Sequence, residues 1–269
     1  MIPSYKVTAL PLGKMLVDRS KMIYQTGAGE PLEIPAWGAA IEGDGARILV
    51  DTGIGDASWV SEHLVPAWIE PRGSMLEALA ELGWSVNDVD VVVNTHLHHD
   101  HCGNNRLFPN ARFVVSAEEW AYAHAPDAVQ RSLYNNELIV GSISFMDYEL
   151  VSADYFAVRQ GIVVVRTPGH TPGHASVLVR TDEGDLCVTG DAAPVRDCFR
   201  LGKPGGIFTS VGDAEASLKK IRQLADRVLL GHDPLIVEFQ SSGYPTVDEV
   251  SRGAGGTVVE HETELEWRQ

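Results

Sequence analysis

The stretch NTHLHHDHCGN, residues 94–104, places four histidines and one aspartate within positions 96–101. The run VDVVV directly before it has the composition of a buried strand, so the cluster begins where that strand ends. In an extended segment His96 and His98 point to the same side, and a turn at Asp100 would direct that carboxylate and His101 towards a neighbouring position. This pattern predicts a site that holds two metal ions side by side.

Three further strands end in loops that carry side chains of the metal-ligand type. The run IVVVR is followed by His170, LCVTG by Asp191 and RVLLG by His232. A single histidine after a strand is more often structural, but four strand ends with suitable chemistry in one chain favour a common site. A two-metal site takes roughly six or seven ligands and usually one bridging carboxylate. Imidazole and carboxylate ligands suit zinc, with iron, manganese or cobalt as alternatives.

Short β-rich runs alternate with amphipathic helical windows along the chain. Two windows have the signature of a capping box, in which the residue before the helix and the residue three positions later bond each other's backbone. The two pairs are Ser74 with Glu77 and Ser116 with Glu119. The other expected elements are two strands that meet at a turn over 43–45, a hairpin that turns at 182–185, and a helix followed by a strand over 213–231. The segments 121–160 and 240–269 show the least regular pattern.

Charge and composition exclude several classes of protein. The 269-residue chain has a formal net charge of −16 and a sequence pI near 4.9, and so acidic a surface repels phosphate backbones, which argues against nucleic acid as a partner. No apolar run approaches the ~20 residues that span a bilayer, so we expect no membrane partner. Three scattered cysteines are too few for a disulfide framework, which favours a cytoplasmic location. We expect a single domain over residues 1–269.

The combined motifs resemble those of the metallo-β-lactamase-fold hydrolases. They are HLHHDH at 96–101, TPGH ending at His170, TGD ending at Asp191 and LGHDP around His232, and the resemblance extends from about residue 5 to about residue 240. Within that superfamily, ILVDTG, VVNTHLHHDHCGN and TPGHTPGHASVLV look most like the N-acyl-homoserine lactonase group, which includes pyridoxolactonase-type enzymes. The resemblance implies an α/β fold, a four-layer αββα sandwich, with a two-metal site at one edge.

The resemblance also implies a role for each residue of the site. His96, His98 and His170 would hold one metal, Asp100, His101 and His232 would hold the other, and Asp191 would bridge them. The implied cofactors are two zinc ions per chain. The implied enzyme is a metal-dependent hydrolase, a quorum-quenching lactonase that acts as a monomer or homodimer. A metal-bridging hydroxide would open a small-molecule lactone or related ester, while Asp100 moves a proton to the leaving group. The aspartate at 191 disfavours a true β-lactamase, since β-lactamases of this fold generally lack it.

One position departs from the resemblance. Homoserine lactonases typically have a tyrosine three residues after the bridging aspartate, where it hydrogen-bonds the substrate, and this chain has Pro194 there. Either a tyrosine from elsewhere replaces it, or the substrate is a different lactone or ester. The candidate tyrosines are Tyr24, Tyr122 and Tyr134. Three cations follow Pro194 closely and either bind a substrate carboxylate or form a solvated basic loop: Arg196, Arg200 and Lys203.

Several residues near the motifs have two interpretations. His174 either supports the metal site or only packs against it, and Asp51 either supports the site or caps a turn. His99 should point away from the metal ligands, at a position that is commonly apolar in the family and can line the substrate pocket. We expect Cys102 to be a small buried hydrophobe, and the surface histidines to be His63, His124 and His261.

Three other functions compete with the lactonase hypothesis. A glyoxalase-II-like thioesterase fits the metal ligands, but the tail at 240–269 is acidic and lacks an evident cationic recognition region. A mononuclear-iron persulfide dioxygenase of the same fold would need one iron and would consume oxygen. A binding protein with a vestigial site is disfavoured because all seven ligand positions are intact.

Overall fold

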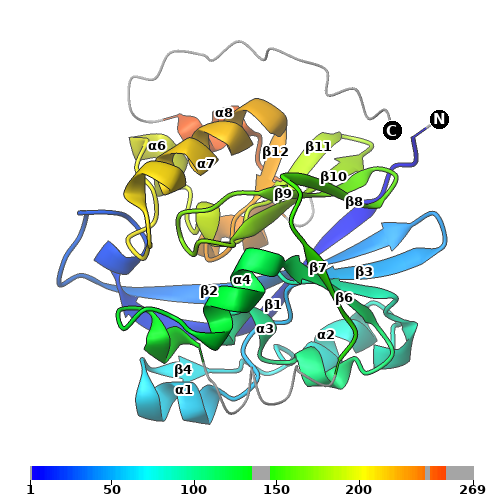
Figure 1. The fold of residues 1–269 in the computed structure, drawn as a ribbon, viewed down its shortest axis with the longest axis horizontal. Coiled ribbons are helices and arrows are strands. Elements are labelled where there is room, and N and C mark those ends of the chain that lie inside the picture. Colours follow the sequence, from blue (N-terminus) through cyan, green and yellow to red (C-terminus); the bar gives the residue numbers. More distant parts are fainter. Residues whose placement is uncertain (1, 135–145, 240–242, 253–269) are drawn as a thin grey trace.

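The computed structural model describes residues 2–134, 146–239 and 243–252. Two β-sheets pack face to face in this part of the chain (Figure 1). The larger sheet has the strand order β4-β1-β2-β3-β5-β6-β7, and the smaller has the order β12-β11-β10-β9-β8. The strands of the larger sheet are β1 (Lys6–Asp18), β2 (Pro31–Gly43), β3 (Ala46–Val50), β4 (Ala67–Trp68), β5 (Val91–Val93), β6 (Arg112–Ser116) and β7 (Tyr148–Val151). Those of the smaller sheet are β8 (Tyr155–Arg159), β9 (Ile162–Arg166), β10 (Ala175–Thr181), β11 (Gly184–Val188) and β12 (Arg227–Leu229).

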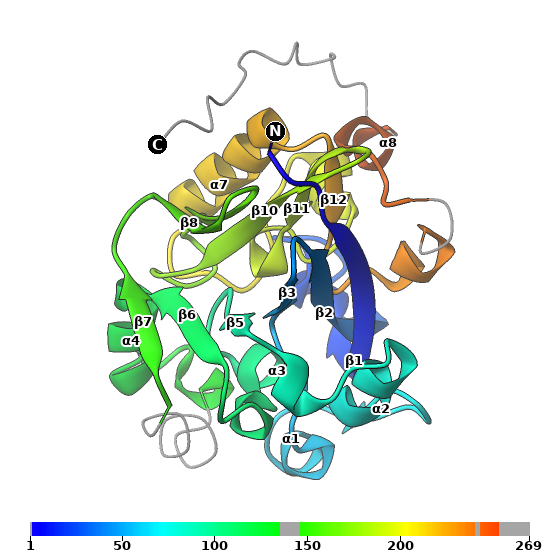
Figure 2. The ribbon, with the colours of Figure 1, turned by 90° about the vertical axis from the view of Figure 1, so that its right-hand side faces the viewer.

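Helices cover the outer face of each sheet, so the predicted four-layer αββα sandwich is confirmed (Figures 1 and 2). Helix α2 contacts β1, α4 contacts β6 and β7, and α7 contacts β11. The α-helices are α1 (Ala57–His63), α2 (Met75–Glu81), α3 (His99–Cys102), α4 (Ala117–His124), α6 (Asp197–Leu201), α7 (Val211–Leu224) and α8 (Val247–Ser251). The 3-10 helices are η1 (Arg19–Lys21), η2 (Val86–Asp88), η3 (Asn105–Leu107), η4 (Arg131–Leu133), η6 (Gly190–Ala192) and η7 (Pro234–Phe239). In the described part of the chain, no helix has the length and apolar character that crossing a bilayer requires.

The alternation of side chains along β3 shows how the layers form. Ile48 and Val50 face the core between the two sheets, whereas Leu49 faces a second core beneath α2, where it joins Met75 and Leu79. Side chains of a strand alternate between its two faces, so a strand that is apolar on both faces must be covered on both sides. The continuous apolar run of β3 therefore requires a sheet on one side and a helix on the other.

Most predicted elements are confirmed. The turn after β2 has Asp44 at φ 48° and Gly45 at φ 69°, which is the left-handed pair that a tight hairpin favours. Ser74 and Glu77 form the predicted capping box at α2. The hairpin of β10 and β11 and the succession of α7 and β12 also lie where expected. The irregular sequence of 121–160 nevertheless contains β7 and β8, because pairing with β6 and β9 supplies the order that the local pattern lacks.

A contact between two glycine backbones holds α3 against the loop after β3. The Gly103 amide donates to the Gly53 carbonyl at 3.1 Å. A Cβ atom on Gly103 would lie 2.3 Å from the Gly55 backbone nitrogen and 2.7 Å from the His99 carbonyl oxygen. No side chain larger than hydrogen fits there, so this glycine lets the histidine-bearing helix approach the β3 loop.

Gly103→Ala should therefore lower the free energy of unfolding by about 1–3 kcal/mol, the usual range for overpacking a buried site. Gly212→Ala is the matched control, because a Cβ at that position in α7 meets nothing within 4 Å. That change should leave stability unchanged or raise it by up to about 1 kcal/mol. Urea unfolding followed by circular dichroism measures both, and equal stabilities of the two variants would contradict this role of Gly103.

Candidate metal centre

The strand topology gathers the ligand-bearing loops at one edge of the sandwich. Strands β3 and β5 are parallel, so the loops that carry Asp51 and His96 leave the larger sheet at the same end. Strands β11 and β12 are also parallel, which brings together the loops of Asp191 and His232. The loop with His170 joins β9 to the antiparallel β10 and lies at the end of the smaller sheet where β11 finishes. Both sheets thus contribute to one site.

Three histidines converge in the first cluster. The Nδ1 atom of His98 lies 3.0 Å from the Nε2 atom of His96 and 3.0 Å from the Nε2 atom of His170. Zn–N bonds of about 2.0–2.1 Å place tetrahedral ligand atoms roughly 3.3 Å apart, so this spacing suits a shared ion. The arrangement brings together the three residues predicted to hold one metal.

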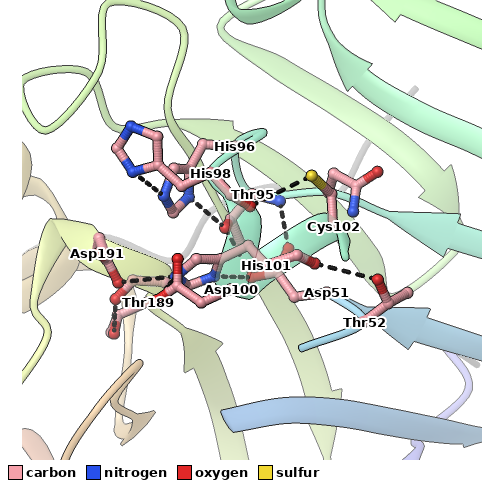
Figure 3. Close-up of polar contacts among 12 residues, drawn as sticks. Asp51, Thr52, Thr95, His96, His98, Asp100, His101, Cys102, Thr189 and Asp191 are labelled. Carbon is pink, nitrogen blue, oxygen red and sulfur yellow. Dashed lines mark hydrogen bonds and ion pairs between the residues drawn. The ribbon is translucent and has the colours of Figure 1, made fainter. Parts of the chain in front are cut away.

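Asp191 lies between this cluster and a second one. Its Oδ2 atom is 3.3 Å from His170 Nε2, while its Oδ1 atom is 3.3 Å from His101 Nε2 and 3.1 Å from His232 Nε2. Asp100 completes the second cluster, with Oδ2 at 3.5 Å from His232 Nε2. Figure 3 shows Asp191, Asp100 and His101 directed towards one another. The two carboxylate oxygens of Asp191 therefore face different clusters.

Unpartnered buried atoms show that these residues fit metal ions. His101 Nε2 and Asp191 Oδ1 are both buried, and neither has a hydrogen-bond partner. An unsatisfied buried polar atom usually costs about 1–3 kcal/mol, so two that face each other call for a shared partner. Although burial alone would lower the pKa of His101, the carboxylates of Asp100 and Asp191 raise it well above the ordinary value. The site therefore attracts positive charge, as a cation site must.

Contacts behind the clusters orient the imidazole rings. The Asp51 carboxylate accepts hydrogen bonds from the backbone amide and the hydroxyl of Thr95, and its Oδ2 atom lies 2.8 Å from His101 Nδ1. Asp51 thus supports the site, and the alternative that it only caps a turn is wrong. His170 Nδ1 contacts the Ile207 carbonyl at 2.9 Å, and His232 Nδ1 contacts the Pro35 carbonyl at 2.7 Å. Each carbonyl accepts a hydrogen bond from Nδ1–H, which leaves the Nε2 lone pair of the neutral ring available to bind an ion.

His174 supports the centre through the loop of Asp191. Its Nε2 atom accepts from the Asp191 backbone amide at 3.0 Å, and its Nδ1 atom donates to the Thr167 carbonyl at 3.1 Å. Complete burial lowers the pKa of His174 to about 3, so the ring is neutral and can accept at one nitrogen while it donates at the other. Of the two interpretations of His174, the supporting role is the one that the geometry matches.

Glu119 differs from its prediction. Ser116 caps α4 as expected, but the Glu119 carboxylate does not return the bond, so the second capping box is wrong. The Glu119 side chain is fully buried and accepts from the Leu97 amide at 2.9 Å, from the Tyr134 hydroxyl at 2.8 Å and from the Thr171 hydroxyl. It links the HLHHDH segment to the loop of His170. The S-x-x-E motif correctly indicated the start of a helix at Ser116, but it did not indicate that the Glu119 side chain turns into the core.

A cavity of about 270 Å³ opens onto the clusters. Its floor includes His98, Asp100, His170, Asp191 and His232, and its apolar walls come from Met15, Val17, Met22, Ile34, Leu64, Val65, Leu133 and Ile207. His99 lines the cavity, so contact with the pocket, which its position in the family allows, is the interpretation that the geometry matches. His63 is exposed, as predicted for a surface histidine, and it also lines the cavity. His124 is exposed as predicted, and His261 lies outside the described residues.

The residues proposed to replace the absent tyrosine do not line this cavity. All seven tyrosines of the chain belong to the described part, and none is a cavity residue. The Tyr122 hydroxyl bonds Asp127, the Tyr134 hydroxyl bonds Glu119, and the Tyr24 ring packs edge-on against Phe208. The tyrosine-replacement hypothesis is therefore wrong for the cavity as it stands.

The three cations after Pro194 have other partners as well. Arg196 pairs with the buried Asp233, Arg200 pairs with Asp197, and the Lys203 ammonium donates to the Thr26 hydroxyl. The cation that lines the cavity is Lys21, which the sequence did not single out. Its carbonyl accepts from the Gly206 amide at 3.0 Å, a long-range contact with no local sequence signal. Cys102 is a buried small side chain, as predicted.

Glu119→Ala should lower the free energy of unfolding by about 2 kcal/mol or more, because it leaves three buried donors without an acceptor. Glu119→Gln keeps one acceptor oxygen and should cost less. Glu118→Ala is the control, because the Glu118 carboxylate is exposed and only pairs with Arg166. Its loss should change the free energy of unfolding by about 1 kcal/mol or less. Chemical unfolding of the three variants measures the order, and equal losses for residues 118 and 119 would contradict the linking role of Glu119.

Known proteins share this architecture. The chain is 28% identical to an N-acyl homoserine lactonase of Bacillus sp over 246 residues, which cover 85% of this chain and 93% of that protein. It is 34% identical to the N-acyl homoserine lactonase AttM of Azorhizobium caulinodans, over 68% of this chain and 70% of that protein. An N-acyl homoserine lactone hydrolase solved with N-hexanoyl-L-homoserine at its catalytic metal centre superposes with a TM-score of 0.75 at 23% identity, over 88% and 96% of the two chains.

The sequence also matches a family model directly. The match covers residues 38–232, which include every residue of the two clusters, and its family is described as the metallo-beta-lactamase superfamily. A quorum-quenching N-acyl homoserine lactone lactonase gives a further superposition with a TM-score of 0.73 at 25% identity, over 87% of this chain and 94% of that one. The family model, the relatives and the two-sheet sandwich agree, and the chain belongs to the metallo-β-lactamase superfamily.

Proposed function

We propose that this protein is a dinuclear metal hydrolase that opens a lactone or a related ester. The observation that carries the proposal is the position of Asp191, whose two oxygens face separate clusters at 3.1–3.3 Å from their histidines. A single ion would not need a carboxylate that faces two ways, so this geometry disfavours a mononuclear dioxygenase. The names of the relatives, which are N-acyl homoserine lactonases, support a lactone as substrate.

The proposed ligands follow the two clusters. His96, His98 and His170 would hold one ion, and Asp100, His101 and His232 the other, with Asp191 between them. Zinc is the metal we propose, because neutral imidazole and carboxylate ligands at four-coordinate spacing suit it. When bound, two such ions supply a water-derived nucleophile at neutral pH and polarise the substrate carbonyl.

The residues of the chain have further tasks in the proposed reaction. One water adds across the ester, the bond between the carbonyl carbon and the ring oxygen breaks, and a hydroxy acid results. Asp100 lines the cavity floor, where its carboxylate can accept the proton of the attacking water. It can then pass that proton to the departing alkoxide. The apolar walls exclude water and accept an acyl or alkyl substituent.

Two wider proposals accompany this function. We propose that residues 1–269 act as one unit, because both sheets contribute to the site and neither could hold the ions alone. A cytoplasmic location is also proposed, since Cys102, Cys187 and Cys198 are all buried and unpaired. Whether the unit is a monomer or a homodimer stays a prediction.

Purified metal-replete protein should contain two metal ions per chain, measured by mass spectrometry of the elements after dialysis. His98→Ala and His232→Ala should each lose metal and hydrolytic activity together, because each removes a ligand from a different cluster. His124→Ala, which changes an exposed histidine on α4, is the control and should keep both ions. One ion per chain in the parent protein would overturn the dinuclear proposal.

Asp191→Asn should cut kcat by about 10²-fold or more and weaken at least one metal. The change keeps the shape of the side chain but removes its charge, and an amide nitrogen cannot coordinate an ion. Asp197→Asn, a change of an ion-paired carboxylate at the start of α6 and outside the cavity, should keep full activity and metal content. If Asp191→Asn hydrolyses a lactone within a few-fold of the parent at unchanged metal content, Asp191 is only a turn residue.

A further inference from the structure

We propose that His99 determines substrate specificity, by hydrogen-bonding a carbonyl group that the substrate carries beside its scissile lactone or ester. This inference rests on the proposed function, since it concerns the same cavity. The expected substrates are lactones or esters that carry a hydrogen-bond acceptor next to the ring or ester carbonyl, such as an acylamino or keto substituent.

The first support is that His99 is a buried polar side chain with unused hydrogen-bonding capacity. Its exposed fraction is 7%, and it lines the cavity. Its Nδ1 atom is buried without a hydrogen-bond partner, and the nearest carboxylate oxygen, Asp100 Oδ1, lies 3.9 Å away. A buried imidazole in this state gains free energy from any partner that enters the cavity.

The second support comes from the other polar groups that line the cavity. Apart from the two metal clusters they are Lys21, His63 and Ser132. His63 already uses its Nδ1 atom, which bonds the Trp59 carbonyl at 2.9 Å, and its ring stacks on Trp59. Lys21 and Ser132 are exposed, so water satisfies them. Among the described cavity residues outside the two clusters, His99 is thus the buried polar side chain that has an unpartnered atom.

The third support is the position of His99 relative to the reacting groups. It is the first residue of α3, directly between His98 of one cluster and Asp100 of the other. The Gly103 contact described above fixes this helix, so the ring is held in place beside the cavity floor. The Trp59 ring lies 6.4 Å from the His99 ring, at a tilt of 57°. A substrate carbonyl adjacent to the scissile group would meet the imidazole where water is largely excluded.

The test compares a matched pair of γ-lactones with substituent chains of equal length, one attached through an amide and one all-carbon. The parent protein should prefer the amide lactone in kcat/KM, and His99→Phe should reduce this preference by roughly 5- to 100-fold, mainly through a higher KM for the amide member. His99→Gln, which retains a donor, should keep part of the preference. His63→Phe changes a histidine of the same cavity whose Nδ1 is already occupied, so it should leave the preference intact.

A binding measurement separates this proposal from the proposed function. The corresponding pair of lactams, whose rings resist opening, can be titrated calorimetrically into metal-loaded parent and variant proteins even if neither lactone is hydrolysed. Failure of hydrolysis with an intact, His99-dependent preference for the amide lactam would overturn the lactonase proposal alone. An unchanged preference in His99→Phe, an equal loss in His63→Phe, no binding of the amide lactam, or loss of metal from both His99 variants would overturn the role of His99.

Discussion

The burial of charged and polar side chains is the constraint on which the rest of this structure depends. Asp51, Asp191 and the histidines of the two clusters are withdrawn from water, and each such group is unfavourable unless it has a partner. The chain supplies partners on the outer side of each ring: the Asp51 carboxylate for His101, and backbone carbonyls for His170 and His232. On the inner side, His101 Nε2 and Asp191 Oδ1 face each other without a hydrogen-bond partner, and a cation would satisfy both.

The same constraint explains why so much of the fold surrounds one edge. Parallel pairing of β3 with β5 and of β11 with β12 delivers loops from both sheets to that edge, and the apolar strands between them form the core that holds it rigid. Buried Glu119 ties two of the loops together from behind. A cavity with apolar walls and an ionic floor results, and electrostatic interactions inside it are stronger than in water. That contrast suits the hydrolysis of an ester that carries a largely apolar substituent.

Much of the fold and the centre could be predicted from the sequence because the signals are local or share a common pattern. The histidines of 96–101 follow a buried strand, and the strand ends before His170, Asp191 and His232 carry complementary chemistry. The Ser74–Glu77 box and the turn over 43–45 depend only on neighbouring residues, and both were correct. The structure brings the seven predicted residues together at one edge, in overlapping groups that include the two predicted sets of three, and their roles as metal ligands stay a proposal.

Side-chain direction and long-range partners were decided only by the tertiary structure. Glu119 has the spacing of a capping residue, yet burial beside three donors outweighs the local bond and turns it inward. The sequence left Arg196 as a candidate for binding a substrate, but in the structure it pairs with Asp233. Lys21 lines the cavity, and its backbone contacts Gly206, which is distant in sequence. The sequence by itself determined which elements form and which residues carry the chemistry, because those depend on local pattern. Which of them face the cavity was decided by packing of the sheets and loops, since burial and pairing energies depend on neighbours that are distant in sequence.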